Sequence, residues 1–401
     1  MTWQFHLDNP VKQKKQVNML ARELPDGIFN VPVANYTVIN AHFVDDAGIA
    51  EWLVRLRNQR ELRVDEIGAS RDGRPLHGFT VGSGRHTCTI TAGAHADEPA
   101  GPVTAMVFAQ WLAGNSPAAV QLRSRATFRI CPQVNPDGAQ RNSPWFAPVP
   151  QLTDYLEHVF REQPGDDVEF GYPGGGKGPL RPENKAVADF LDGAGAPVFH
   201  ASLHSMAYAS GAWFLLGGPA SADRHLQLEL ARVAFKHGLG LHDIERNGDK
   251  GFTRLALGFC TTPDSRAMAA HFLQLGDPAT ADKFHFSSME YTALKNPDAY
   301  LMVTELPVFL LKSNPALEAG APIEAALAAP APQPGETPYE RFRDELRTHL
   351  GAGDRAHACR LAREYGAEAL PFSRQCSVMV EALLLAIDAA ISAASATESK
   401  P

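Results

Sequence analysis

Apolar runs short enough for strands alternate with helical patterns through the middle of the chain. Residues 87–92 (TCTITA) alternate polar with apolar positions and end at Gly93, which predicts a strand. Residues 101–112 place apolar side chains at helical spacing, and residues 126–134 (ATFRICPQV) return to a strand pattern. Strand, helix and strand in this order predict a βαβ unit within an α/β fold, whose mixed, mainly parallel twisted sheet is flanked by helices.

Further elements of both kinds extend this sheet. The polar turn from Ser70 to Pro75 separates two strand-like segments, 64–67 and 78–81, and so predicts a hairpin. A proline at the start of residues 182–192 favours a helix there. Later strands are predicted at 198–205, 213–216 and 299–306, and a further helix at 224–237.

The two ends of the chain differ from this middle part. Residues 1–60 form a lead-in with one predicted helix at 47–57, for which Asp45 and Asp46 are candidate caps. The α/β pattern occupies residues 61–312, and the Pro- and Ala-rich residues 313–337 predict a linker. Residues 338–401 predict a helical C-terminal extension that packs on the main domain or on itself, with helices at 339–350, 355–365 and 372–394.

Composition places the chain among globular proteins. Its 401 residues are 44% hydrophobic and 20% charged, which is enough for one large core and an accessory element. The formal net charge of −8 and a pI near 6.0 argue against a nucleic-acid partner, because such a surface needs a concentrated basic patch. The one compact basic run, Lys12 to Lys15, is typical of a solvated N-terminal segment.

Cysteine usage and the apolar segments bear on location. The five cysteines are odd in number, widely spaced and without Cys-x-x-Cys spacing, so they indicate neither a disulfide framework nor a thiolate metal site. The N-terminus lacks the apolar core of a signal peptide, and no uninterrupted apolar stretch reaches membrane-spanning length. We therefore expect a cytoplasmic protein with no membrane partner. The sequence does not indicate its oligomeric state.

The first candidate functional residues follow directly after the predicted strand at 87–92. His95 and Glu98 are three residues apart where a loop enters a helix, so both side chains can project on one face and meet one cation. Taken alone, such a pair is more often a solvated or hydrogen-bonded His–Glu contact than a metal site. Other polar groups at strand ends decide between these interpretations, because sites gather at the carboxyl ends of parallel strands.

Two histidines and one glutamate occupy such positions. His200 and His204 point to the same side of one strand but lie about 13 Å apart if the strand is extended, so they cannot share one metal. His204, at the strand end, suits a ligand, whereas His200 suits a core histidine. Glu305 follows the apolar run of the strand at 299–306, where a buried carboxylate requires a structural ion pair or a functional role.

Together, His95, Glu98 and His204 provide two imidazoles and one carboxylate. This is a ligand set of catalytic zinc sites, which leave a fourth position open, and it predicts one Zn²⁺ per chain. A nearby carboxylate can then take a proton from water that attacks a carbonyl group, and Glu305 is the best placed candidate.

Five motifs in order, between about Glu66 and Leu306, resemble those of the zinc metallocarboxypeptidase (funnelin) family, of the carboxypeptidase A-like kind. The first two are the Ser70–Leu76 hairpin (SRDGRPL) and the Gly93–Glu98 segment (GAHADE), which resembles the first zinc motif. The others are the Asn135–Gly138 turn (NPDG), the Ser202–Ser205 segment (SLHS) of the third ligand, and Thr304–Leu306 (TEL) around the general base.

The resemblance implies roles for single residues. Glu305 would act as general base and then as general acid, while zinc would polarise the scissile carbonyl. Arg141, three residues after Gly138, corresponds to the family arginine that stabilises the oxyanion. An ordinary surface arginine is the alternative for Arg141, and the adjacent Asn142 has no assigned role.

This sequence departs from the family pattern at two places that bind the substrate. The family carries an Asn-Arg pair within an Asp-x-Asn-Arg sequence that grips the substrate's C-terminal carboxylate, but here Asp167-Val168-Glu169-Phe170 stands in that place. Glu169 and Phe170 should disfavour a free carboxylate there and favour an ammonium, amide or masked end, unless Arg181 or Arg254 substitutes for the pair.

The second departure is the tyrosine expected some twenty residues before the general base. Residues 282–288 contain no tyrosine, so His285 is the candidate substitute, against a structural role, and Tyr291 comes late for it. Met289 and Glu290 fall near the family's specificity pocket, which leaves an apolar or a cation-accepting pocket open.

The sequence thus predicts a zinc-dependent hydrolase of peptide or amide bonds, acting on a peptide or an amidated or acylated amino acid. One alternative is an N-acyl amino acid deacylase of the aspartoacylase or succinylglutamate desuccinylase type, against which the NPDG turn and the hairpin motif argue. A second is a non-catalytic zinc- or peptide-binding module, against which the three ligands and Glu305 argue.

Overall fold

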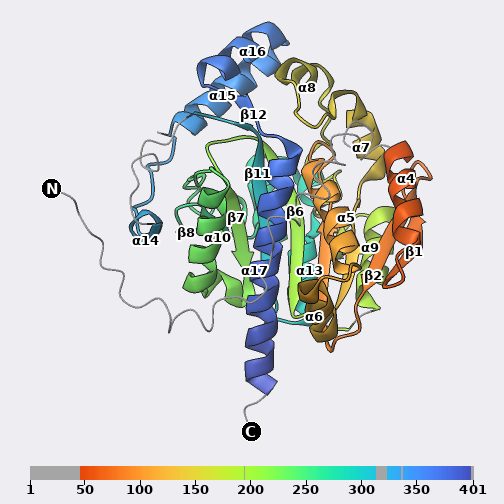
Figure 1. Ribbon diagram of the computed structural model, residues 1–401. Coiled ribbons are helices and arrows are strands. Elements are labelled where there is room, and N and C mark those ends of the chain that lie inside the picture. Colours follow the sequence, from red (N-terminus) through yellow and green to blue (C-terminus); the bar gives the residue numbers. More distant parts are fainter. Residues whose placement is uncertain (1–45, 194, 313–322, 336, 399–401) are drawn as a thin grey trace, which may run out of the picture.

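The computed structural model describes residues 46–193, 195–312, 323–335 and 337–398. Most of the predicted lead-in, including Lys12 to Lys15 and Asp45, and residues 313–322 of the predicted linker lie outside this part. Within it, the chain forms one large sheet with helices on both faces (Figure 1).

The sheet has ten strands and a parallel centre. The strand order is β1-β2-β4-β3-β6-β11-β7-β9-β8, and the short β12 pairs with β11 beyond that path. β4, β3, β6 and β11 pair in parallel, whereas β2 and β7 run antiparallel to their neighbours in this central group. The predicted mixed, mainly parallel sheet is therefore confirmed. The strands are β1 (Leu62–Ala69), β2 (Pro75–Val81), β3 (His86–Ala92), β4 (Ala126–Cys131), β6 (Phe199–Ala209), β7 (Trp213–Gly217), β8 (Arg254–Ala256), β9 (Phe259–Thr261), β11 (Tyr300–Leu310) and β12 (Glu368–Ala369).

Helices cover the sheet in two layers. On the face toward the viewer in Figure 1 lie α4 (Asp46–Arg57), α5 (Ala100–Leu112), α6 (Pro117–Arg125), α10 (Arg224–Lys236) and α17 (Phe372–Glu398). The other face carries α9 (Pro182–Asp192) and α13 (Ser288–Lys295), together with a two-stranded ribbon of β5 (Tyr172–Gly175) and β10 (His285–Phe286). The remaining helices are α7 (Pro136–Asn142), α8 (Leu152–His158), α11 (Ser265–Gln274), α12 (Pro278–Ala281), α14 (Ile323–Leu327), α15 (Pro338–Gly351) and α16 (Arg355–Glu364).

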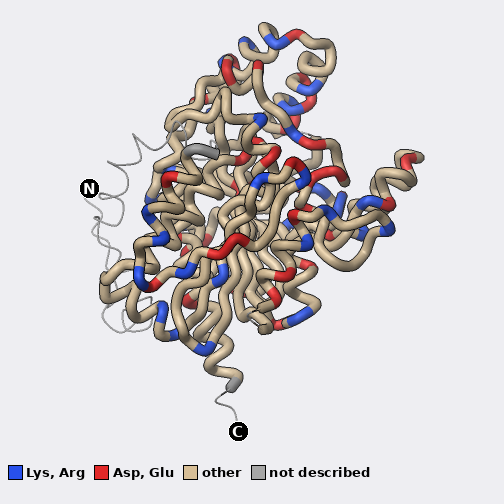
Figure 2. The backbone as a smooth tube through the Cα atoms, turned by 90° about the vertical axis from the view of Figure 1, so that its right-hand side faces the viewer, with Lys and Arg blue, Asp and Glu red and all other residues tan. Residues whose placement is uncertain are grey.

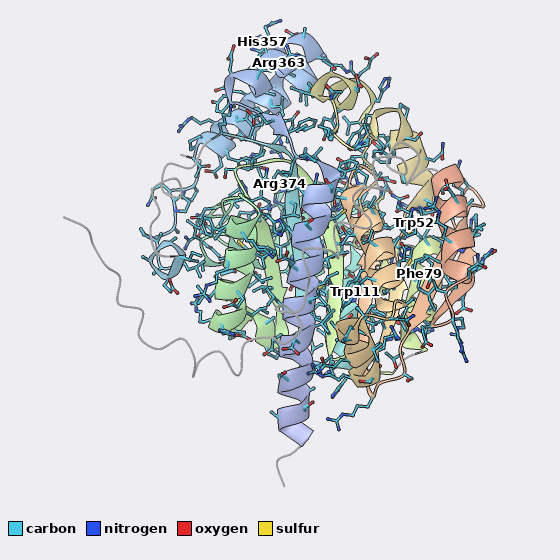
Figure 3. All side chains as sticks on the ribbon, in the orientation of Figure 1. Trp52, Phe79, Trp111, His357, Arg363 and Arg374 are labelled. Atoms are coloured by element: carbon cyan, nitrogen blue, oxygen red, sulfur yellow. The ribbon has the colours of Figure 1, made fainter. Side chains whose placement is uncertain are left out.

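Side-chain alternation along the central strands separates a large core from the site. In β6, Phe199, Ala201 and Leu203 belong to the main apolar cluster shared with α5 and α17. The intervening positions therefore face the other side, and these include His204. In β11 the same alternation sends Leu301 and Val303 to a separate apolar cluster on that second face. The edge of the main cluster reaches Trp52 and Phe79, both labelled in Figure 3.

α17 belongs to the core of this fold. By length and composition, it is the one helix of the described residues that could cross a membrane, yet 78% of its apolar window is buried in the structure. It packs against α5 and α10 and on β6 and β11, so its apolar face is covered by protein. Glu381, near its middle, pairs with Lys236 and His237 of the α10 end.

Several local predictions were incomplete. The Asn135 turn opens helix α7, because the Asn135 side chain accepts a hydrogen bond from the Gly138 amide and caps the helix. The polar stretch 154–178, for which no element was predicted, contains β5 and most of α8. α6 was not predicted because its residues carry no apolar periodicity strong enough to separate it from a loop.

Candidate metal centre

Three predicted ligands converge at the carboxyl end of the central strands. His95 Nδ1 lies 2.8 Å from Glu98 Oε1, and His204 Nδ1 lies 2.9 Å from Glu98 Oε2. The two Nδ1 atoms are 3.1 Å apart, and the three residues form a group whose donor atoms suit one metal ion. Two imidazole nitrogens and a carboxylate that face one point match the donor preference of Zn²⁺.

The backbone fixes these ligands from both sides. His95 and Glu98 lie between β3 and α5, and the Glu98 amide donates to the His95 carbonyl at 3.3 Å. Gly101 lets α5 approach β6 closely, because a Cβ at this position would lie 2.3 Å from the Leu203 carbonyl oxygen. From β6, the Ser205 amide then donates to Glu98 Oε2 at 3.1 Å. The ligands are therefore held by packed elements rather than by a free loop.

Glu305 lies next to the ligands. It is directly paired with His204 in the parallel register of β11 and β6, so both side chains project from the same face of the sheet. Its Oε2 atom is buried and finds no hydrogen-bond partner among the described residues. Burial, followed by the negative charge of Glu98, raises the pKa of Glu305 well above its usual value.

Glu169 contacts the far side of the His204 ring. Its Oε2 lies 3.2 Å from His204 Nε2, and Ser202 Oγ lies 2.7 Å from the same nitrogen. Although burial opposes ionisation, the neighbouring His204 keeps the pKa of Glu169 below its usual value. When Nδ1 offers its lone pair to a metal, Nε2–H can donate to Glu169, which fixes the tautomer and the ring orientation.

The charges around the centre favour a bound cation. Arg161 Nη1 contacts Asp97 Oδ1 at 3.0 Å and Glu98 Oε1 at 2.9 Å, but a single guanidinium faces a larger number of carboxyl groups. A divalent cation between the ligands would offset that excess. The donor set and the charge both fit Zn²⁺. The carboxyl groups that act electrostatically on this cluster belong to Asp97, Glu98, Asp167, Glu169 and Glu305.

A cavity of about 330 Å³ opens beside the metal ligands. Its polar part includes Glu305 and Arg161, while Phe170 and Phe284, whose rings are 5.5 Å apart, belong to its apolar part. The lining residues are His95, Arg161, Glu162, Pro164, Asp167, Glu169, Phe170, His204, Leu215, Arg246, Lys250, Phe252, Pro263, Met268, Phe284, Val303, Glu305 and Arg347.

The structure places Arg141 and Arg161 differently. Arg141, the predicted oxyanion residue, is exposed on α7, and its guanidinium carbon lies 3.2 Å from the centre of the Phe160 ring. It lines a neighbouring surface groove, whereas Arg161 lines both that groove and the cavity with Glu305. Arg161 follows α8 in an irregular polar segment, where neither periodicity nor spacing distinguishes it from other surface arginines.

Two other predicted site residues, Met289 and His285, are buried. Met289 is 1% exposed and packs in the apolar cluster behind Leu215 and Val303. His285 is buried in β10, with Nδ1 3.2 Å from the Gly174 carbonyl oxygen. Their roles in substrate binding stay predictions.

The two arginines considered as replacements for the carboxylate clamp are engaged elsewhere. Arg181 contacts Glu183 and the Asp166 carbonyl, and Arg254 forms a bidentate pair with Asp243. His200, expected in the core, is buried with Nδ1 2.8 Å from Thr89 Oγ1. The cations that do line the cavity besides Arg161 are Arg246, Lys250 and Arg347.

The fold and the site are those of a zinc-dependent metallohydrolase. Residues 49–214 match the family model described as zinc carboxypeptidase, Peptidase_M14. The matched segment contains all three metal ligands, and the chain is a zinc carboxypeptidase-like hydrolase.

Two solved structures show the range of similarity. The metallo-carboxypeptidase from Burkholderia cenocepacia is 14% identical, with 86% of this chain and 69% of that chain covered and a TM-score of 0.45. The bovine thrombin-activatable fibrinolysis inhibitor, in complex with tick carboxypeptidase inhibitor, is 14% identical, with 87% and 97% covered and a TM-score of 0.41. The comparison with curated proteins found no match.

Proposed function

We propose that this protein hydrolyses peptide or amide bonds with one zinc ion held by His95, Glu98 and His204. The observation that carries the proposal is the position of Glu305, which projects beside His204 from the neighbouring strand and opens to the same cavity. Bound zinc would supply Lewis acidity, which polarises a carbonyl group and acidifies water.

The protein's own groups would carry out the proton transfers. Glu305 is placed to take a proton from the attacking water and to deliver it to the leaving nitrogen. Arg161 supplies a fixed positive charge next to Glu98 and can stabilise the negative charge that develops on the carbonyl oxygen.

Substrate-end recognition would differ from that of a carboxypeptidase with an Asn-Arg clamp. Glu169 is engaged with His204, and Phe170 presents an apolar ring to the cavity, so neither residue offers a cation at this place. A free carboxylate therefore needs another partner if this enzyme is to accept one.

We also propose a cytoplasmic location and a small substrate rather than a nucleic acid. The five cysteines are all free, which agrees with a reducing compartment. Figure 2 shows basic and acidic positions interspersed over the described chain, rather than gathered into one basic surface.

The decisive experiment combines zinc analysis with the substitution Glu305→Gln. The wild-type protein should retain one zinc per chain and cleave peptides, and the variant should keep zinc while losing about 10²- to 10⁴-fold in rate. Glu345→Gln, an exposed change on α15, is the matched control. Absence of stoichiometric zinc, or unchanged hydrolysis by the Glu305 variant, would contradict the proposal. Cleavage of N-acyl amino acids but not of peptides would identify a deacylase instead.

A further inference from the structure

A second set of charges lines the catalytic cavity, and its sign is opposite to that of the carboxyl cluster. Arg246 and Lys250 come from the loop that precedes β8, and Arg347 comes from α15. We call Arg246, Lys250 and Arg347 the basic wall. The family match ends at residue 214, so all three lie outside the part of the chain that it covers.

α15 is fixed firmly enough to present a side chain to the cavity. Phe342 and Leu346 are buried in the main core, and Thr337 and Glu340 form a capping box at the start of the helix. Arg347 lies eight residues after Tyr339, which places the two on one side of the helix, and the Tyr339 ring packs 4.4 Å from that of His242. In Figure 1, α15 lies at the end of the sheet where β11 ends.

The loop that carries Lys250 has an uncommon backbone. Lys250 and Asn247 adopt positive φ angles of 57° and 48°, a backbone conformation that residues other than glycine rarely adopt. Arg246 pairs with Asp249 at 3.2 Å and lies 4.0 Å from the centre of the Phe252 ring, which also lines the cavity. Such local strain persists where the surrounding structure fixes it, and it commonly occurs at binding sites.

Two cations of the basic wall, Lys250 and Arg347, form no salt bridge with the described residues. Among the described residues, neither Lys250 nor Arg347 makes a salt bridge or a side-chain hydrogen bond, whereas Arg343, one turn earlier on α15, pairs with Asp344. Burial, followed by the charge of Arg246, lowers the pKa of Lys250, as expected for cations held together. An anion entering the cavity would find donors that are not already engaged.

We propose that Lys250 and Arg347 bind a carboxylate of the substrate, so that the preferred substrates are peptides whose C-terminal residue carries this charge into the cavity. The inference rests on the proposed hydrolytic function. In this proposal, the 246–252 loop and α15 bind the carboxylate that the family's Asn-Arg pair would otherwise bind. The rings of Phe170, Phe252 and Phe284 line the apolar part of the same cavity. A volume of about 330 Å³ is at the small end of ligand pockets and suits one or two amino-acid residues.

The carboxylate has two sources, the C-terminal α-carboxylate and an acidic side chain. Four peptides separate them: acetyl-Phe-Glu and acetyl-Phe-Gln, each with a free and with an amidated C-terminus. With zinc-loaded full-length protein, we expect the substrates with the recognised carboxylate to exceed the others about tenfold or more in kcat/KM. Dependence on the free terminus identifies the α-carboxylate, and dependence on Glu over Gln identifies the side chain. Equal rates for all four peptides would overturn the inference.

Substitutions then locate the binding groups. Lys250→Gln and Arg347→Gln should each raise KM for the preferred peptide about tenfold, with little change in kcat and no change for the neutral peptide. Arg341→Gln, on the same helix but away from the cavity lining, is the matched control. An equal loss on charged and neutral peptides, or no loss on either, would show that these side chains do not recognise the carboxylate.

A binding measurement separates this inference from the hydrolytic function. Isothermal titration calorimetry with 4-phenylbutyrate and its neutral amide needs no turnover. The acid should bind more tightly than the amide to the wild-type protein, and this difference should disappear in the double variant Lys250→Gln/Arg347→Gln. If the difference persists in the double variant, the carboxylate binds elsewhere and the inference fails. If it disappears while no peptide is cleaved, the binding site stands and the hydrolytic proposal fails.

Discussion

Glu169 Oε2 lies 3.2 Å from His204 Nε2, on the side of the imidazole ring opposite the nitrogen that faces His95 and Glu98. A residue that would belong to a substrate clamp in the family pattern therefore supports a metal ligand here. Carboxylates in this position orient a ligating histidine and increase its basicity.

We expect Glu169→Gln to weaken zinc binding about 10- to 100-fold, because the amide cannot provide the same charge to the Nε2–H group. Competition with a chromophoric chelator measures the affinity directly. Asp166→Asn is the control, since Asp166 lies in the same loop but pairs with Lys283. Equal zinc affinities for the wild type and the Glu169 variant would show that the contact does not support the ligand.

Substitutions of Arg161 and Arg141 can show which of the two guanidinium groups takes part in catalysis. Arg161→Gln should lower kcat/KM about 10²- to 10³-fold, as the loss of an oxyanion donor does, while Arg141→Gln should leave it nearly unchanged. Zinc content and melting temperature should be measured for both variants, because Arg161 also contacts the buried Asp97 and Glu98. A larger loss with Arg141→Gln would restore the role that the motif spacing predicts.

Gly101 sets the approach of α5 to β6, and hence the distance between Glu98 and Ser205. Gly101→Ala should destabilise the protein by about 1–3 kcal/mol or more, because the added Cβ meets the backbone of Leu203. Gly351→Ala, at the end of α15, has nothing within 4 Å and should change stability little. Urea unfolding midpoints compare the two variants, and similar midpoints would argue against a close helix–strand contact.

His242 should contribute to acid sensitivity. Burial lowers its pKa to about 3, so below about pH 6.5 the unfolded chain binds a proton that the folded protein does not bind. Stability is therefore lost as the pH falls from about 6.5 toward 3, by up to about 1.4 kcal/mol per pH unit for this residue. His242→Gln should flatten this dependence in urea unfolding between pH 7 and 5. The exposed His225→Gln serves as control, and parallel curves for the wild type and the His242 variant would refute the prediction.

The centre of the fold was predictable because each part carries a local signal. The β3–α5–β4 unit follows from periodicity, and the positions of His204 and Glu305 follow from the rule that sites gather at the ends of parallel strands. The His95 and Glu98 spacing is likewise local. Together these signals predict three converging ligands and the adjacent carboxylate.

The rest of the cavity depends on long-range packing that leaves no mark in the local sequence. Arg161, Lys250 and Arg347 lie in a polar segment, a loop and a helical extension, and each resembles an ordinary surface cation until the fold brings them together. Arg141 illustrates the opposite situation, because its spacing after Gly138 predicts an oxyanion role while its guanidinium packs on the Phe160 ring and lines the neighbouring groove.

The support that α17 gives to the metal centre has a consequence for biosynthesis. Gln375, fully buried in this helix, accepts a hydrogen bond from the Ser205 hydroxyl, 170 positions earlier in the chain, and the Ser205 amide in turn contacts Glu98. During translation, the ligands emerge long before the helix that supports them. A nascent or prematurely ended chain would therefore hold the zinc-binding residues without the completed centre, so proteolytic competence would arise only after nearly the whole fold has been made.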